Sequence, residues 1–183
     1  MAFDIANYLK KRGFAGVDSK FRSCISEWLE WYQGEVASFH KYTIYNGKNT
    51  VSMVKKSLQM AKFICEDWAN LLLNEHVTIS VADGFQEKLQ QALDRADWCT
   101  NANRLVELAF AAGTGAFVEY KGAGGLSEID FIRADMIHPL SWNNRGITEC
   151  AFGSVQMING KEAVYLMIHR LENGHYVIEN RLF

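Results

Sequence analysis

The sequence predicts an α+β fold in which N-terminal helices pack on a mixed or antiparallel sheet of hairpins. Apolar residues recur at helical spacing in several segments before Gly113, and they alternate with period two from Ala116 onward. Turn dipeptides such as Asn159-Gly160 separate the alternating runs. A chain of 183 residues with 49% hydrophobic residues is long enough to bury one core.

The first third of the chain is expected to be helical. Residues 1–50 are predicted to form an N-terminal helical arm, ahead of a core domain formed by residues 51–183. In the arm, one helical face carries five apolar residues, with Ser19 as a cap and Gly34 as the end of the helix. The five are Phe21, Ile25, Trp28, Leu29 and Tyr32. A loop, YTIYNGKN at residues 42–49, follows.

The longest periodic segment predicts a helix over residues 54–72. Its apolar seam consists of Val54, Leu58, Ala61, Cys65, Trp68 and Leu72. Because a seam of this kind normally docks on a core, Trp68 is predicted to be a buried anchor. Glu66 and Asp67 lie off the seam and point about 100° apart, so they do not share one substrate. The alternation of VTISV at residues 77–81 then predicts a half-buried strand.

Two more helices and five strands complete the predicted order. Asp83-Gly84 predicts a turn, residues 85–96 predict an amphipathic helix, and Thr100 is expected to cap a helix through residue 109. Gly113 to Gly115 join a helix to a strand, the reverse of the order in phosphate-binding loops. Strands are expected at 116–121, 128–133, 147–158, 162–171 and 175–183. Because the last strand pattern reaches Phe183, we expect this to be the front part of a longer protein.

The charges exclude a protein whose main surface grips nucleic acid. There are 19 basic and 21 acidic side chains, for a formal net charge of −2. The basic residues form only short clusters, for which a solvated face is the ordinary interpretation. The clusters are Lys10–Arg12, Lys20 with Arg22, and Lys55 with Lys56, the last following Tyr42 and Tyr45. A small nucleic-acid-binding module remains an alternative, and no apolar run is long enough to span a membrane.

No motif of an enzyme, cofactor or metal site is recognisable. Cys24, Cys65, Cys99 and Cys150 are widely spread without a CxxC pair and are expected to be reduced core thiols. His169 and His175 could face each other across a turn, but two ligands do not make a stable metal site, and His40, His76 and His138 add no ligand spacing. The predictions are therefore no catalytic residue, no cofactor and no metal. A cysteine- and histidine-dependent α+β enzyme is the alternative.

A series of ordered segments resembles one protein family. They are EWYQGE (30–35), HKYTIYNGKN (40–49), MAKFICEDWANLLLNEHVTIS (60–80), ELAFAAGTGAFVEY (107–120), HPLSWNNRGITECAF (138–152) and YVIENRLF (176–183). In this order they resemble tailed-bacteriophage portal proteins of the siphophage type from Gram-positive hosts. The similarity runs from about Trp28 to the end of the chain.

The resemblance implies a ring, usually a dodecamer, at one vertex of the phage head. Double-stranded DNA enters and leaves through this ring. Expected partners are other copies of the chain, the terminase, the major capsid or scaffolding protein and the head-completion adaptor, with no membrane partner. The implied locations are the virion and, during assembly, the host bacterial cytoplasm. This chain would cover most of the wing and end before the stem and clip. No catalytic residue is implied, because the packaging ATPase is a separate protein.

Overall fold

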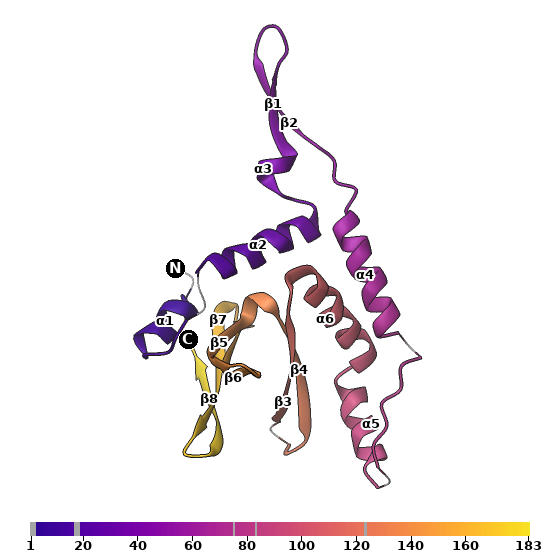
Figure 1. Cartoon of the computed structure of the whole chain (residues 1–183), viewed down its shortest axis with the longest axis vertical. Coiled ribbons are helices and arrows are strands. Elements are labelled where there is room, and N and C mark those ends of the chain that lie inside the picture. Colours follow the sequence, from indigo (N-terminus) through magenta and orange to yellow (C-terminus); the bar gives the residue numbers. More distant parts are fainter. Residues whose placement is uncertain (1–2, 17–18, 75, 83, 123) are drawn as a thin grey trace. The chain divides into compact units, whose positions relative to one another are not determined.

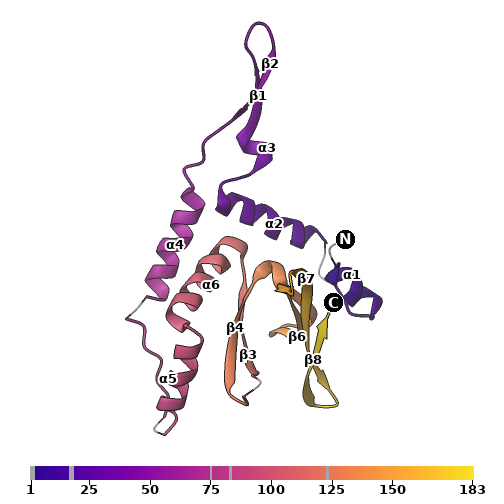
Figure 2. The same cartoon turned by 180° about the vertical axis from the view of Figure 1, so that it is seen from behind.

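The computed structural model describes residues 3–16, 19–74, 76–82, 84–122 and 124–183, and its fold is α+β (Figures 1 and 2). The predicted class is confirmed in this form: the described residues contain six α-helices, two two-stranded sheets and one four-stranded sheet. All paired strands are antiparallel. The chain divides into two compact units, Met1–Arg22 with Asp135–Phe183, and Ser23–Ala134.

The first unit contains one helix and the four-stranded sheet. Helix α1 spans Ile5–Lys11, and the strands, in spatial order, are β5 (Ile137–Asn143), β6 (Gly146–Ile158), β7 (Lys161–Glu172) and β8 (His175–Leu182). The β6–β7 and β7–β8 hairpins confirm the predicted turns. Asn159 and Gly160 have φ of 51° and 75°, and Asn173 and Gly174 have 50° and 79°. Two left-handed residues in succession match the right-handed twist of the strands they join.

The core of the first unit lies between α1 and one face of this sheet. Its buried members are Leu9, Leu140, Ala151, Leu166 and Ile168. Leu166 and Ile168 lie two positions apart on β7, so both side chains point to the face that α1 covers. Gly153 lets α1 approach, since a Cβ there would collide with Ile5 Cδ1.

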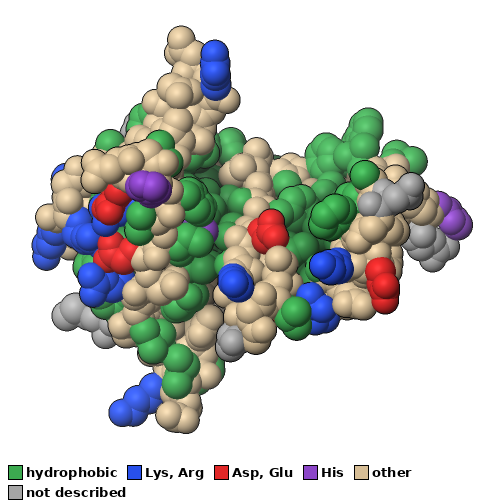
Figure 3. Space-filling model, turned by 90° about the horizontal axis from the view of Figure 1, so that it is seen from below, with side chains coloured by type: hydrophobic (Ala, Val, Ile, Leu, Met, Phe, Trp, Pro, Cys, Tyr) green, Lys and Arg blue, Asp and Glu red, His purple; other side chains and the backbone are tan. Residues whose placement is uncertain are grey.

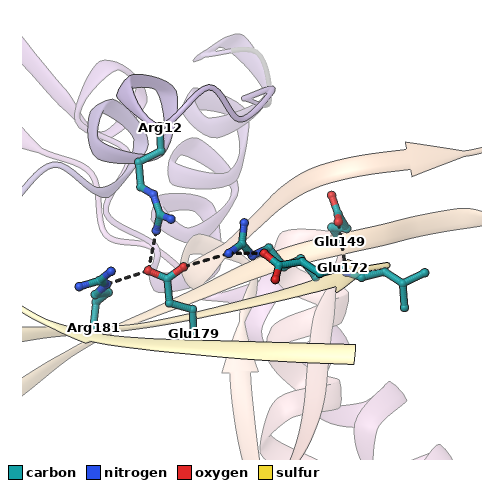
Figure 4. Close-up of polar contacts among 7 residues, drawn as sticks. Arg12, Glu149, Glu172, Glu179 and Arg181 are labelled. Carbon is teal, nitrogen blue, oxygen red and sulfur yellow. Dashed lines mark hydrogen bonds and ion pairs between the residues drawn. The ribbon is translucent and has the colours of Figure 1, made fainter. Parts of the chain in front are cut away.

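Ion pairs hold the end of α1 to the edge strand β8 (Figure 4). Arg12 Nη1 and Arg181 Nε each lie 2.7 Å from Glu179 Oε1. Arg170 Nη2 lies 3.5 Å from Glu179 Oε2 and 2.6 Å from Glu172 Oε1. Hydrogen bonds from Arg12 and Arg181 lower the pKa of Glu179 to about 2.

The second unit is a group of helices with two hairpins. Its elements are α2 (Ser19–Gln33, from Ser23 on), α3 (Ala37–His40), β1 (Lys41–Tyr45), β2 (Thr50–Val54), α4 (Met60–Leu72), α5 (Gln86–Arg95), α6 (Trp98–Ala112), β3 (Gly115–Lys121) and β4 (Ser127–Arg133); the 3-10 turn η1 (Ala134–Met136) follows. Helix α6 packs against α4 and against the β3–β4 hairpin. Gly34 and Gly113 end their helices with φ of 76° and 83°, as the sequence predicts. None of the described helices has the length and hydropathy of a transmembrane segment.

Four local predictions about the second unit are wrong. Residues 50–54 form β2, so the helix predicted over 54–72 begins only at Met60. Residues 77–81 form no strand. The Gln86 side chain bonds their backbone in place of a neighbouring strand: it accepts from the Val81 amide at 3.0 Å and donates to the Ile79 carbonyl at 3.2 Å. Residues 42–45 are strand, not loop, and Thr100 lies inside α6. Asp83 of the predicted turn lies outside the described residues.

Candidate interaction surface

Helix α4 turns its large apolar side chains outward. Its buried residues are small, with Cys65 8% and Ala69 0% exposed, and they allow α6 to pack closely. The prediction that Trp68 is a buried anchor is wrong, because Trp68 is 50% exposed. The other apolar residues of the outward side are Met60, Phe63, Ile64 and Leu71, each more than half exposed. Exposed apolar groups that gather in this way mark interaction sites.

Helix α6 and one acidic residue complete this surface. Phe110 of α6 is 46% exposed and stacks on Trp68, with ring centroids 5.8 Å apart and an interplanar angle of 22°. Asp67 follows Ile64 by three positions and precedes Leu71 by four, so it lies on the same outward line of the helix. It makes no ion pair or hydrogen bond with the described residues. We call this surface the α4 face: Met60, Phe63, Ile64, Asp67, Trp68, Leu71 and Phe110.

The β1–β2 hairpin, residues 41–54, extends away from the helices of the second unit (Figures 1 and 2). From here on, the arm means this hairpin and not the helical arm predicted for residues 1–50. Every strand residue of this arm is exposed. In its register Tyr42 lies opposite Met53 and Ile44 opposite Val51, so these four side chains share one face. Thr43 and Ser52 lie on the other face. We call the apolar side, formed by Tyr42, Ile44, Val51 and Met53, the arm face.

The base of the arm is fixed against the end of α2. The Lys55 amide donates to the His40 carbonyl at 2.8 Å. Gln59 Nε2 donates to the Gln33 carbonyl at 3.5 Å. A Cβ on Gly34 would lie 2.5 Å from Ser57 Oγ, so the segment leading out of the arm runs directly past this glycine. These contacts place the base of the arm beside the end of α2.

The structure brings one cysteine and one histidine together. Cys150 on β6 lies directly opposite His169 on β7. Both are buried, and burial raises the pKa of the Cys150 thiol to about 11 and lowers the pKa of His169. The thiol donates to the Ala151 carbonyl, with 3.7 Å from Sγ to the oxygen. A neutral thiol beside a neutral imidazole is the opposite of the thiolate that nucleophilic catalysis needs.

The remaining cysteines do not form a reactive pair either. Burial, followed by nearby Glu107, raises the pKa of Cys65, and Cys24 is half-buried. Cys99 is exposed, contrary to the expectation of core thiols. It lines an open hollow of about 470 Å³ together with His76, Asn70, Leu73, Asn74, Thr100 and Asn103. None of the described residues that line this hollow is a carboxylate, and His76 supplies their one imidazole.

The two histidines that were possible metal ligands across the β7–β8 turn are not paired. His169 and His175 do not face each other, because their cross-strand partners are Ile178 and Glu172. His169 Nδ1 instead bonds the Tyr176 hydroxyl at 2.5 Å. Among the described residues no group of three or more His, Cys, Asp or Glu side chains could hold a metal ion.

One polar cluster was missed by the sequence reasoning. The Tyr120 hydroxyl donates to Glu128 at 2.9 Å and lies 3.5 Å from Asp130, which is two positions further along β4. Burial raises the pKa of Asp130. Alternation along a strand places such residues on one face, but only the pairing with β3 brings the tyrosine to them. The tyrosine hydroxyl on β3 lies within hydrogen-bonding distance of both carboxylates on β4, so the cluster links the two strands of this hairpin.

Some residues of the basic clusters make contacts within the protein. Arg12 pairs with Glu179, and Arg22 Nη1 donates to His138 Nδ1 at 2.7 Å. Lys55 Nζ lies 4.4 Å from the centre of the Phe39 ring. In the space-filling view, acidic and basic side chains lie interspersed among hydrophobic ones (Figure 3). Arg12 and Arg22 are therefore engaged within the protein and are not free to bind a phosphate backbone.

The comparisons with known proteins do not assign this chain to a family. No protein-family model matches the sequence, and none of the curated proteins matches it. The case for a function therefore depends on the residues and surfaces described above.

Proposed function

We propose that this chain is the wing portion of a bacteriophage portal protein, a structural component of the head-tail connector vertex. Double-stranded DNA would be packaged and ejected through the ring that it helps to build. Two lines of argument support this proposal. One is the ordered series of segments from Trp28 to Phe183 that resembles portal proteins. The other is the pair of exposed apolar surfaces on the second unit.

The observation that carries the proposal is that the second unit has two different exposed apolar surfaces. The α4 face and the arm face come from separate elements and have different shapes, one a helix and the other a hairpin. Monomeric proteins rarely leave contiguous apolar patches of this kind in water. A ring built from head-to-tail contacts requires two different complementary surfaces on each subunit. The α+β fold with antiparallel hairpins is compatible with a portal wing.

The proposal includes the following partners. Other copies of the chain would form a ring, twelve in the usual family arrangement. The terminase, the major capsid or scaffolding protein and the head-completion adaptor would contact the ring, and double-stranded DNA would pass through it. The chain itself would have no catalytic activity and no cofactor, and it would be located in the virion and, before assembly, in the host cytoplasm.

The experiment that tests this function is electron microscopy of the purified full-length gene product. Negative-stain images are expected to show ring-shaped particles, and multi-angle light scattering should give a mass of many subunits. A product that stays monomeric in both measurements, at all concentrations used for assembly, would contradict the portal function.

A cysteine- and histidine-dependent enzyme makes a different prediction. It requires one thiolate, so iodoacetamide would label Cys150 rapidly at pH 7 if His169 activated it. We expect the reverse: Cys99 should react like an ordinary exposed thiol, and buried Cys65 and Cys150 should react only after unfolding. Mass spectrometry of peptides from the labelled chain measures each rate. Fast labelling of Cys150 in the folded chain would favour the enzyme.

A further inference from the structure

We propose that the arm face of one copy packs on the α4 face of a second copy, in a head-to-tail contact. This inference rests on the proposed function in one respect, because it names the subunit contact of the proposed ring. It commits to a second copy of this chain as the occupant of both surfaces.

The first argument is the form of the two surfaces. A two-stranded hairpin alone is marginally stable in water and needs further strands or a helix packed against its apolar side. The arm face offers Tyr42, Ile44, Val51 and Met53, all between 37% and 44% exposed. Helix α4 offers a ridge of large apolar side chains with the Trp68–Phe110 stack beside it. A helix laid across one face of a hairpin is a standard two-layer arrangement, and it removes both surfaces from water.

The second argument is charge. Residues 36–59, which include the arm, contain four lysines and no acidic residue: Lys41, Lys48, Lys55 and Lys56. Helix α4 contains Lys62, Glu66 and Asp67, and Lys62 Nζ lies 3.6 Å from Glu66 Oε1, so Asp67 supplies the net negative charge of this helix. Asp67 lies within the α4 face and has no partner among the described residues. Opposite charges of this kind orient two surfaces and disfavour pairing of either surface with its own copy.

The third argument is that the arm of one chain does not reach the α4 face of the same chain. The arm extends beyond the N-terminal end of α4 and away from the C-terminal half of that helix (Figures 1 and 2). Its base is held by the bond from the Lys55 amide to the His40 carbonyl and by the passage of Ser57 at Gly34. The two surfaces therefore meet only when they belong to different copies, and the contact leaves one free surface of each kind.

The experiment uses two variants of the 183-residue chain that each lose one surface. Ile44→Asp places a charge in the arm face, and Ile64→Asp places one in the α4 face; both positions are exposed, so the fold should survive. The matched controls are Thr43→Asp, on the opposite face of the arm, and Gln91→Asp, at an exposed position of α5 outside the α4 face. Circular dichroism checks that all four variants fold. Analytical ultracentrifugation measures association.

The proposal expects a specific pattern. The unmodified chain and both controls should self-associate. Each surface variant alone should weaken association by at least about 30-fold, which corresponds to about 2 kcal/mol. An equimolar mixture of the two variants should form a one-to-one dimer that grows no further, because the intact α4 face of the first variant accepts the intact arm of the second.

Other outcomes overturn the contact. Self-association of the Ile64→Asp variant alone would show that arms pair with arms. Self-association of the Ile44→Asp variant alone would show that α4 faces pair with each other. A monomeric unmodified chain whose arm binds mixed-sequence duplex DNA would assign the arm to nucleic acid, provided that the binding is lost when Lys41 and Lys48 are replaced by glutamate.

Two outcomes separate the contact from the portal function. If full-length rings persist with both surface variants, the contact is wrong and the portal function stands. If the variant dimer forms but the full-length product makes no ring, the function fails and the contact stands.

Discussion

Acid should destabilise the first unit through one buried histidine, His138 on β5. His138 is only 5% exposed, and Arg22 Nη1 donates to its Nδ1 at 2.7 Å. Because this nitrogen accepts, the ring is neutral in the folded chain. Burial, followed by the positive charge of Arg22, lowers the pKa of His138 from 6.5 to about 4.

The sign and size of the effect follow from this pKa. A histidine whose folded pKa is depressed stabilises the fold fully above its unfolded pKa of 6.5, and that stabilisation is lost as the pH falls from 6.5 towards 4. A difference of this size corresponds to about 3 kcal/mol in the free energy of unfolding. Since small domains are stable by only about 5–15 kcal/mol, the loss is large. His169, whose pKa burial also lowers, acts in the same direction.

The assay compares the chain with a His138→Gln variant. The glutamine carbonyl can still accept from Arg22 but does not titrate, so this variant should lose about 2–3 kcal/mol less stability between pH 6.5 and pH 4. Urea unfolding followed by circular dichroism at pH 7, 6, 5 and 4 measures the difference. His175→Gln, at an exposed position, is the matched control. Parallel stability curves for the chain and the His138 variant would refute the reasoning.

Three further substitutions test other parts of the fold by urea unfolding. Glu179→Gln should cost about 1–2 kcal/mol at pH 7 through loss of the Arg12 pair, a cost that disappears below about pH 2, where the carboxyl of Glu179 is protonated; an equal cost at every pH would contradict the ion pair. Leu166→Ala, at a fully buried site, should cost about 2–5 kcal/mol, and a loss under 1 kcal/mol would contradict its place in the core. Gly34→Ala should strain the φ of 76° and displace Ser57, so hydrogen exchange should quicken at the base of the arm; unchanged exchange would contradict that base.

The sequence predicted the C-terminal hairpins because their signals are local. Two left-handed residues at Asn159-Gly160 and Asn173-Gly174 set each turn, and alternation along β7 then decides which side chains face the core. Helices α5 and α6 were found for a similar reason, since their apolar residues recur over several turns.

The errors lie where a local pattern had two readings. The segment Thr50–Val54 alternates as a strand should, yet Val54 and Leu58 also fit the spacing of the helix that follows. Asn46-Gly47 lies between two alternating runs and was a usable hairpin signal for the arm. The strand predicted at 77–81 failed because alternation cannot show whether a neighbouring strand exists. The contacts of Cys150, His169 and Tyr120 depend on strand register, which no single segment contains.

The error on Trp68 has a different physical meaning. Apolar spacing on a helix indicates that a face must leave water, but it does not identify the surface that covers it. In α4 the small residues Cys65 and Ala69 suffice to pack on α6, and the large side chains are left over. The arm face shows the same excess, with apolar residues alternating on a hairpin whose strand residues are all exposed. Large apolar side chains in water cost stability, and the presence of two such surfaces on one unit is the physical reason for proposing a contact between copies.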